Sequence, residues 1–200
     1  MTKYLLGISL LALPYSVVHA GDDISQKRVQ EDSTIGSYRW IADAPSGARF
    51  QLVQRIPDQT RSFYNVRGFP INAADVYATS CVMQTIFNNN TNNKVVSFNL
   101  ADWTITHNGV KKPLKLTTEW MDEWKKMGVS QSARIAFRWS QFPTVQKHQP
   151  GDWFQGMIAA GLPGGSSFDL GIKWTENGVT HTATIKDVQC AKDRILGGKK

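Results

Sequence analysis

Apolar and polar side chains alternate along several segments of this chain, with the two-residue period of β-strands that bury one face. The clearest alternation covers residues 168–190 and is interrupted by Asn177-Gly178, a dipeptide typical of a two-residue hairpin turn. With two turn residues, cross-strand partners share a face in a self-consistent register: Trp174 with His181, Ile172 with Ala183, and Leu170 with Ile185. We therefore predict a hairpin whose second strand runs to Cys190.

Further segments of this kind predict additional strands. One covers residues 48–55, and another covers 95–106 and returns over 110–116 through a turn at His107-Asn108-Gly109. Residues 133–139 predict a strand with one basic face and one dry face. The dry face consists of Ala133, Ile135, Phe137 and Trp139. The chain is therefore expected to consist mainly of β-strands.

Two segments have helical character instead. The first, about 72–88, can be capped by Asn72 and is apolar around most of its circumference, which predicts a buried helix containing Cys81. The second, about 118–127, has acidic residues early and lysines late, as the helix dipole favours. Its apolar stripe consists of Trp120, Trp124 and Met127. Residues 61–70 are expected to form a loop before the first helix.

Short strands punctuated by turns, with two inserted helices, favour a mainly β fold. We predict an immunoglobulin-like β-sandwich with inserted helices at about 72–88 and 118–127. The expected organisation is a signal peptide, a flexible N-terminal lead-in, a single β-sandwich domain and a basic tail, at residues 1–20, 21–47, 48–195 and 196–200.

The first twenty residues have the pattern of a secretory signal. Lys3 precedes an apolar run over residues 4–13, Pro14 ends that run, and Val18-His19-Ala20 suits a signal peptidase. The run is about half the roughly 20 apolar residues that a membrane-spanning helix needs. We therefore expect cleavage near Ala20-Gly21, a mature protein without a transmembrane anchor, and a location in the periplasm or outside the cell.

The chain has only two cysteines, Cys81 and Cys190, and both follow the predicted cleavage point. An isolated pair in an oxidising compartment is typical of a structural disulfide. No C-x-x-C motif is present, so the sequence does not support thioredoxin-like chemistry. We predict a Cys81–Cys190 disulfide.

Basic residues exceed acidic residues by 23 to 16, which gives a net charge of +7. This surplus favours an anionic partner, such as a lipid headgroup, an acidic glycan or an acidic protein. The basic residues are scattered along the chain rather than clustered, so the pattern does not favour nucleic acid.

A mixture of arginine and aromatic side chains, which protein interfaces enrich, marks a candidate partner-binding site. Its predicted residues are Arg61, Phe63, Tyr64, Arg67 and Phe69 in the expected loop, and Trp153 after the turn at Pro150-Gly151-Asp152. Five other tryptophans are expected to fill the core instead: Trp103, Trp120, Trp124, Trp139 and Trp174.

Metal binding and catalysis are the alternatives. Imidazole and thioether ligands suit copper, and candidate ligands are His107, His148 and His181 with Met83, Met121, Met127 and Met157. No two histidines lie at ligand spacing, and no zinc, nucleophile-elbow or paired-carboxylate motif is present. The sequence therefore favours an exported, non-catalytic binding or accessory protein that engages a protein or anionic partner. A copper-binding or copper-delivery protein is the alternative, and an enzyme acting on cell-envelope glycans is a weaker one.

Overall fold

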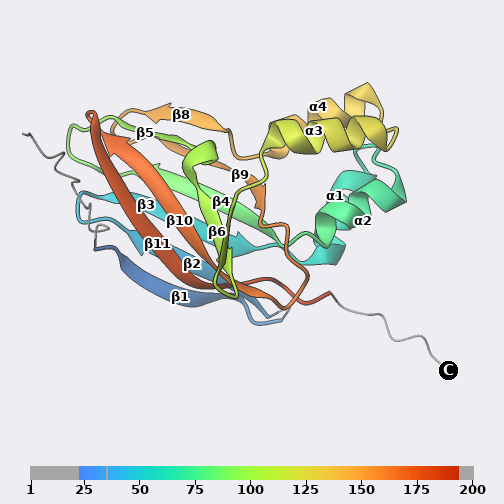
Figure 1. Cartoon of the computed structure of the whole chain (residues 1–200), viewed down its shortest axis with the longest axis horizontal. Helices are drawn as coiled ribbons and strands as arrows, with labels where there is room; N and C mark the ends of the chain where they lie inside the picture. Colours follow the sequence, from blue (N-terminus) through green and yellow to red (C-terminus); the bar gives the residue numbers. More distant parts are fainter. Residues whose placement is uncertain (1–22, 35, 194–200) are drawn as a thin grey trace, which may run out of the picture.

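The computed structural model describes residues 23–34 and 36–193, and in this part of the chain two antiparallel sheets pack face to face (Figure 1). The predicted signal peptide and basic tail lie outside the described residues. The first sheet has the order β1-β2-β3-β4-β9. Its strands are β1 (Ser25–Asp32), β2 (Ser37–Asp43), β3 (Ala48–Gln54), β4 (Val82–Asn89) and β9 (Trp153–Ala159).

The second sheet is built around β10, which pairs with β11 along one side and with β5 and β6 along the other. A short 3-10 turn at Leu100–Asp102, capped by Asn99, separates β5 from β6 and divides the strand predicted over 95–106. The strands of this sheet are β5 (Val96–Asn99), β6 (Thr104–His107), β7 (Val110–Pro113), β8 (Val145–His148), β10 (Ser167–Glu176) and β11 (Val179–Gln189).

The β10–β11 hairpin has the predicted register: Trp174 pairs with His181, Ile172 with Ala183, and Leu170 with Ile185. Its turn residues, Asn177 and Gly178, have φ angles of 48° and 88°. Asparagine and glycine tolerate this left-handed backbone, whose twist matches that of the flanking strands. The β6–β7 hairpin turns in the same way at Asn108-Gly109. Both hairpin predictions are confirmed.

Aromatic rings fill the space between the sheets. The Phe50 ring lies 4.9–6.2 Å from four other aromatic rings, contributed by both sheets, which are those of Phe87, Phe98, Trp103 and Trp174. Trp40 is 1% exposed, and its indole Nε1 donates to the Asp187 carbonyl of β11 at 3.1 Å. Trp40 lies on β2, so the flexible lead-in predicted over 21–47 is wrong for its described part, because β1 and β2 belong to the first sheet.

Four α-helices in the described residues gather at one end of the sandwich (Figure 1). They are α1 (Pro57–Asn65), α2 (Ile71–Ala78), α3 (Thr117–Lys126) and α4 (Gln131–Ser140). Their inward side chains form a second core that also contains Val82, Met157 and Ala159 of β4 and β9. None of the helices in the described ranges is long and apolar enough to cross a membrane.

The prediction of a strand over 133–139 is wrong, because these residues belong to α4. Ala133 and Phe137 are fully buried, whereas Ile135 and Trp139 are exposed on the opposite side of the helix. Residues four apart share a face in a helix and also in a strand, so this spacing satisfies both periods. Packing of Phe137 against Tyr64 and Tyr77, with ring centroids 5.5 and 5.0 Å away, fixes the helical alternative.

The helix predicted over 72–88 is only partly correct. Helix α2 ends at Ala78, Cys81 adopts a φ of 58°, and β4 begins at Val82. Residues from Val82 onward pair with β3 and β9, so both sides of this strand receive backbone hydrogen bonds that a helix would not use. The loop predicted over 61–70 is also wrong in part, because α1 begins at Pro57, a favoured first residue of a helix, and extends to Asn65.

The described fold is therefore mainly β, with two antiparallel sheets as predicted, but it has four helices rather than two. The helix predicted at 118–127 is confirmed as α3, and its Trp120 and Trp124 are buried in the helical core.

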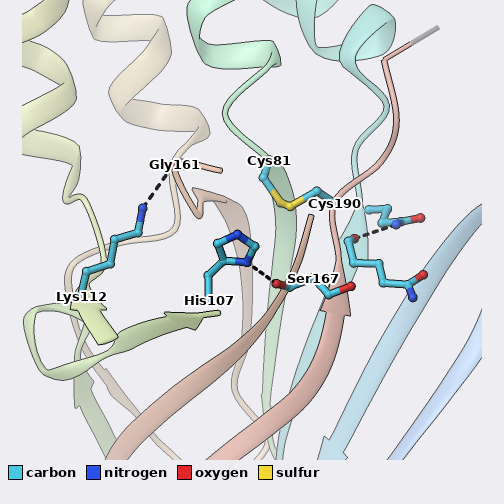
Figure 2. The surroundings of a disulfide bond; sticks show 8 residues. Cys81, His107, Lys112, Gly161, Ser167 and Cys190 are labelled. Atoms are coloured by element: carbon cyan, nitrogen blue, oxygen red, sulfur yellow. Dashed lines mark hydrogen bonds between the residues drawn. A yellow bond between two sulfur atoms is a disulfide. The ribbon is translucent and has the colours of Figure 1, made fainter. Parts of the chain in front are cut away.

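The predicted disulfide between Cys81 and Cys190 is confirmed (Figure 2). Cys81 directly precedes β4 in the first sheet, and Cys190 directly follows β11 in the second sheet. The bond therefore ties the two sheets together at the end that faces the helices, and it closes a loop across a sequence separation of 109 residues.

Replacing both cysteines by alanine should lower the free energy of unfolding by about 2–5 kcal/mol, because the unfolded chain regains the entropy that a long covalent loop removes. Urea unfolding of the wild-type and Cys81→Ala/Cys190→Ala proteins measures this difference. A loss of less than about 0.5 kcal/mol would contradict a stabilising role for the bond.

Candidate functional site

The aromatic residues predicted to bind a partner divide into a buried and an exposed group. Tyr64 and Phe69 are 0% and 5% exposed and belong to the helical core. Their rings contact each other with centroids 5.1 Å apart, and both contact Phe137. The two side chains therefore stabilise the helices and are not available to a partner in this conformation.

Arg61 fastens three segments of the chain together. Its guanidinium pairs with Asp58 of α1 at 2.8 Å, Asp75 of α2 at 2.7 Å and Asp193 at 2.5 Å. The hydrogen bonds with Asp193, and then with Asp75 and Asp58, raise the pKa of Arg61 above its ordinary value despite partial burial. This arrangement is typical of an arginine that stabilises the fold, because its guanidinium is already paired with carboxylates.

Arg67 remains at the surface. Its guanidinium stacks 3.5 Å from the centroid of the Phe63 ring, and it donates a hydrogen bond to the Phe63 carbonyl at 2.8 Å. Phe63 is itself partly buried against the helical core. This pair keeps one charged group of the predicted site accessible.

A buried network of side-chain hydroxyl and amide groups lies inside the helical cluster. The Tyr77 hydroxyl donates to Gln141 Oε1 at 2.7 Å, and Gln141 Nε2 donates to the Tyr64 hydroxyl at 2.9 Å. The Tyr64 hydroxyl also lies 2.8 Å from Ser140 Oγ. Burial raises the pKa of both phenols, so they stay neutral and paired. The network positions Gln141, the residue at which the chain leaves α4 for the first sheet.

The tryptophans show the largest difference in exposure. Trp139 and Trp153 are 78% and 60% exposed, whereas the other five are at most 3% exposed: Trp40, Trp103, Trp120, Trp124 and Trp174. The prediction that Trp139 fills the core is therefore wrong, because α4 turns it to the side opposite Phe137. The prediction of core positions holds for Trp103, Trp120, Trp124 and Trp174.

The exposed side of α4 is an apolar stripe beside a basic group. Ile135 and Trp139 are four residues apart and 42% and 78% exposed, and Arg138 lies exposed beside them. The helix contains two arginines, at 134 and 138, and no acidic residue. Sequence reasoning missed this stripe, although the Ile135–Trp139 spacing was a signal that could have revealed it.

The residues that directly follow helix α4 lie against β9. Gln141 forms a parallel bridge with Met157, and the Phe142 amide donates to the Met157 carbonyl at 2.9 Å. This close approach depends on Gly156, since a Cβ there would lie 2.4 Å from the Phe142 nitrogen. Trp153 lies four residues from Met157 along β9, or roughly 13 Å at the rise of a strand. Phe154, 37% exposed, lies next to it.

We call Ile135, Arg138, Trp139, Trp153 and Phe154 the Trp139–Trp153 surface. Its members come from α4 and β9, which meet where residues 141–142 contact Met157, and the described structure leaves both tryptophan rings largely uncovered. Aromatic side chains beside arginine are the composition that protein interfaces enrich.

The three histidines that were candidate copper ligands lie in different environments. His107 Nδ1 contacts the Ser167 carbonyl at 2.7 Å (Figure 2), whereas His181 stacks on Trp174 with ring centroids 5.3 Å apart. Ser167 and Trp174 are seven residues apart on β10, or roughly 23 Å along the strand. Within residues 23–34 and 36–193, no group of three or more histidine, cysteine, aspartate or glutamate side chains is placed to hold a metal.

His148 is 4% exposed, and its ring contacts the rings of Phe87 and Phe98, with centroid distances of 4.8 and 5.6 Å. Its Nε2 is buried without a hydrogen-bond partner in the described structure. Burial lowers the pKa of His148 below 6.5, although the nearby Asp152 charge acts in the opposite direction. The side chain is therefore a neutral part of the sandwich core.

A buried carboxylate occupies the end of the sandwich away from the disulfide. Glu176 is 2% exposed, and it accepts hydrogen bonds from Lys94 Nζ at 2.8 Å, Trp174 Nε1 at 3.0 Å and the Ser46 hydroxyl. Burial alone would raise the pKa of Glu176, but the bonds from Lys94, Ser46 and Trp174 outweigh it and lower the pKa. The carboxylate thus fastens two loops to β10.

Two hollows in the described part of the chain are open troughs. One, of about 750 Å³, lies on the outer face of the second sheet and is lined by the side chains of Thr104, Thr182, Thr184, Lys111, Lys173 and Lys186, among others. The other, of about 600 Å³, lies between α3 and the sandwich, where Lys112 Nζ donates to the Gly161 carbonyl at 3.2 Å (Figure 2).

The second trough also contains Glu119 and Glu123, one helical turn apart. The Glu119 carboxylate accepts a hydrogen bond from the backbone amide of Leu116 at 2.7 Å, and the Glu123 carboxylate forms an ion pair with Lys115. Both carboxylates are therefore occupied by contacts that cap and brace α3. The weaker prediction, an enzyme that acts on glycans, would need a pair of accessible carboxylates, and Glu119 and Glu123 do not provide one.

No protein-family model, no curated protein and no solved structure matches this chain. Its function therefore has to be inferred from its own residues and geometry.

Replacing His148 by phenylalanine should flatten the dependence of stability on pH just below pH 6.5. In the wild type, the imidazole of the unfolded chain takes up a proton below pH 6.5, whereas the buried imidazole of the folded chain does not. The free energy of unfolding therefore decreases as the pH is lowered, until the pH falls below the lower pKa of the folded state. Thermal unfolding at a series of pH values compares the two proteins. Parallel curves would contradict a buried neutral His148.

Replacing Glu176 by glutamine should lower the free energy of unfolding at neutral pH by about 1.5–3 kcal/mol, the usual value for hydrogen bonds to a charged group. The folded-state pKa is lowered, so the contribution of the carboxylate is present above pH 4.5 and is lost as the pH falls below that value. Urea unfolding at pH 7 and pH 3 should therefore show a large difference that shrinks in acid. A difference that stays the same at both pH values would contradict this origin.

Proposed function

We propose that this chain is an exported, non-catalytic binding or accessory protein that docks a protein partner through the Trp139–Trp153 surface. The observation that carries the proposal is the exposure of two tryptophans, at 78% and 60%, in a fold that buries the other five. Burying the apolar area of an indole is favourable, and an indole exposed to water lacks this free energy. A bound partner would recover it.

The area of these side chains suits a standard interface. A buried aromatic side chain removes about 150–250 Å² from water. Two tryptophans would therefore supply roughly half of the ~800 Å² that each partner contributes to a typical complex. Trp and Arg are also the residues most often dominant in binding energy.

The charge of the surface favours an acidic partner. Helix α4 presents Arg134 and Arg138 without an acidic residue, and the whole chain has a net charge of +7. Complementary charge accelerates association and disfavours basic competitors. This supports a protein with an acidic rim as the partner.

The remaining predictions are consistent with this role. A disulfide is expected in an oxidising compartment and supports export, whereas the signal peptide and the periplasmic or extracellular location stay predictions. An immunoglobulin-like arrangement also stays a prediction. Strands β1 to β4 form consecutive antiparallel pairs in the first sheet, and β10 stands between β11 and the β5–β6 edge in the second.

The test compares Trp139→Ser and Trp153→Ser with the matched control Val179→Ser, which changes a 61% exposed apolar residue beside the β10–β11 turn. Because all three side chains are exposed, each variant should unfold within about 0.5 kcal/mol of the wild type. Each tagged protein is used to isolate bound envelope proteins, which are quantified by mass spectrometry. We expect one partner retained by the wild type and Val179→Ser and reduced at least tenfold by either tryptophan variant. Equal retention by all four proteins, or no enriched partner, would refute the proposal.

A further inference from the structure

Strand β9 forms an edge of the first sheet, and its first half has an uncovered backbone. The Asn89 amide of the β4 side donates to the Asp152 carbonyl at 2.9 Å, and the Ala160 amide donates to the Cys81 carbonyl at 3.1 Å. Even-numbered residues therefore direct their amide and carbonyl groups toward β4, since both groups of a residue in an antiparallel strand point to the same side.

Odd-numbered residues direct these groups away from β4. The Met157 carbonyl illustrates this, because it accepts the Phe142 amide from outside the sheet. The segment at 141–142 covers the edge only beside Met157. In the described part of the chain, the amide and carbonyl groups of Trp153 and Gln155 consequently face an open edge.

The other outer strands in the described structure are protected against pairing with a further strand. Strand β1 contains Lys27, Arg28, Glu31 and Asp32; β7 contains two lysines and Pro113; and β8 contains Lys147. On β11, the amide and carbonyl of Lys186 are both bonded by the Gln26 side chain, at 2.8 and 2.7 Å. Charges, prolines and covering groups are the devices by which proteins blunt sheet edges.

Strand β9 lacks these devices along its first half. Its sequence WFQGMIA contains no charged residue and no proline, and its register with β4 continues without a shift. Uncovered apolar edges of this kind promote non-specific strand pairing, which natural proteins avoid. An edge that is left open beside exposed aromatic side chains therefore suits a specific strand.

We infer that an extended segment of the protein partner adds to the first sheet along the β9 edge at Trp153–Gln155, as β-strand addition. This inference rests on the proposed function and names its mode of binding. The added strand would satisfy the open amide and carbonyl groups of Trp153 and Gln155. Its side chains would alternate between the outer face, beside Trp153, and the opposite face, beside Phe154.

Phe154 is well placed for this role. It lies on the face of β9 that also carries Ile158 of the sandwich core, and its ring is 6.2 Å from that of Phe142. It nevertheless remains 37% exposed at the edge. An apolar residue of the incoming strand would cover this exposed part, so the segment should carry apolar side chains at alternate positions.

The dimensions and charge favour a partner segment over a second copy of this chain. The open stretch covers residues 153–155 before the edge meets 141–142, so two copies joined here would share a very short ladder. Two chains of net charge +7 also repel each other. We therefore assign the edge to an uncharged or acidic extended segment.

The test uses the full mature protein and heptapeptides selected on it from a random library. Gln155→Pro removes the outward amide of residue 155, and proline is tolerated where that amide faces away from the sheet. Gln155→Thr keeps the amide and changes only the side chain, so it is the matched control. Fluorescence anisotropy should show at least a tenfold weaker affinity for Gln155→Pro and a change of less than threefold for Gln155→Thr.

A second measurement leaves the protein unchanged. Methylating backbone amides of a selected peptide at alternate positions should weaken binding in one of the two phases and not in the other, because only alternate amides of an added strand face β9. This readout holds even if Gln155→Pro fails to fold. Similar affinity for both methylated phases, or no selected peptide that competes with the partner, would overturn the inference.

Other outcomes also separate the two proposals. If Gln155→Pro keeps the protein partner while Trp153→Ser loses it, the docking surface stands and strand addition is wrong. If sedimentation shows a dimer of the wild type that Gln155→Pro converts to a monomer, the occupant is a second copy and the inference is wrong.

Discussion

The pairing of β4 with β9 is the constraint on which the rest of this structure depends, because both faces of this strand pair are buried near the helices. On one face, Met83 and Ile158 belong to the core between the sheets. On the other face, Val82, Met157 and Ala159 belong to the helical core. Because successive side chains of a strand point to opposite faces, neighbouring residues of β4 and β9 lie in two different cores. The helices are therefore required to keep the second face dry.

The disulfide and the buried tyrosine network each hold a segment of the chain next to this strand pair. Cys81 immediately precedes β4, and its bond to Cys190 joins the first sheet to the end of β11. Gln141, bonded to Tyr64 and Tyr77, holds the chain beside Met157 as it leaves α4. A covalent bond and a buried polar network thus both brace the part of this strand pair that lies near the helices.

The same constraint accounts for the surface proposed to bind a partner. The chain covers β9 only at its second half, where the helical core and residues 141–142 meet Met157. The first half keeps its backbone edge and the rings of Trp153 and Phe154 accessible. The helix that packs Phe137 inward must turn Trp139 outward, because the two residues are two positions apart. Exposure of both tryptophans follows from how the two cores are closed.

Local patterns in the sequence determined the elements whose partners are near in the chain. The hairpin that pairs Trp174 with His181 follows from a two-residue period and Asn177-Gly178, and helix α3 follows from its charges and its Trp120–Trp124 stripe. The two cysteines sufficed to predict the disulfide because no other pairing exists. The alternating strands and turns also sufficed to predict a β fold with two sheets. In the predicted site, the sequence correctly suggested Trp153 as an exposed aromatic residue.

Tertiary structure decided the segments whose partners are distant. Residues 82–88 became a strand because β3 and β9 pair with both of its edges, and residues 131–140 became a helix because Phe137 packs on Tyr64 and Tyr77. The sequence pattern likewise did not predict the burial of Tyr64 and Phe69 or the exposure of Trp139. It also did not predict the open edge of β9. Apolar residues four apart fit a helix and a strand equally, so only contacts with distant parts of the chain could distinguish them.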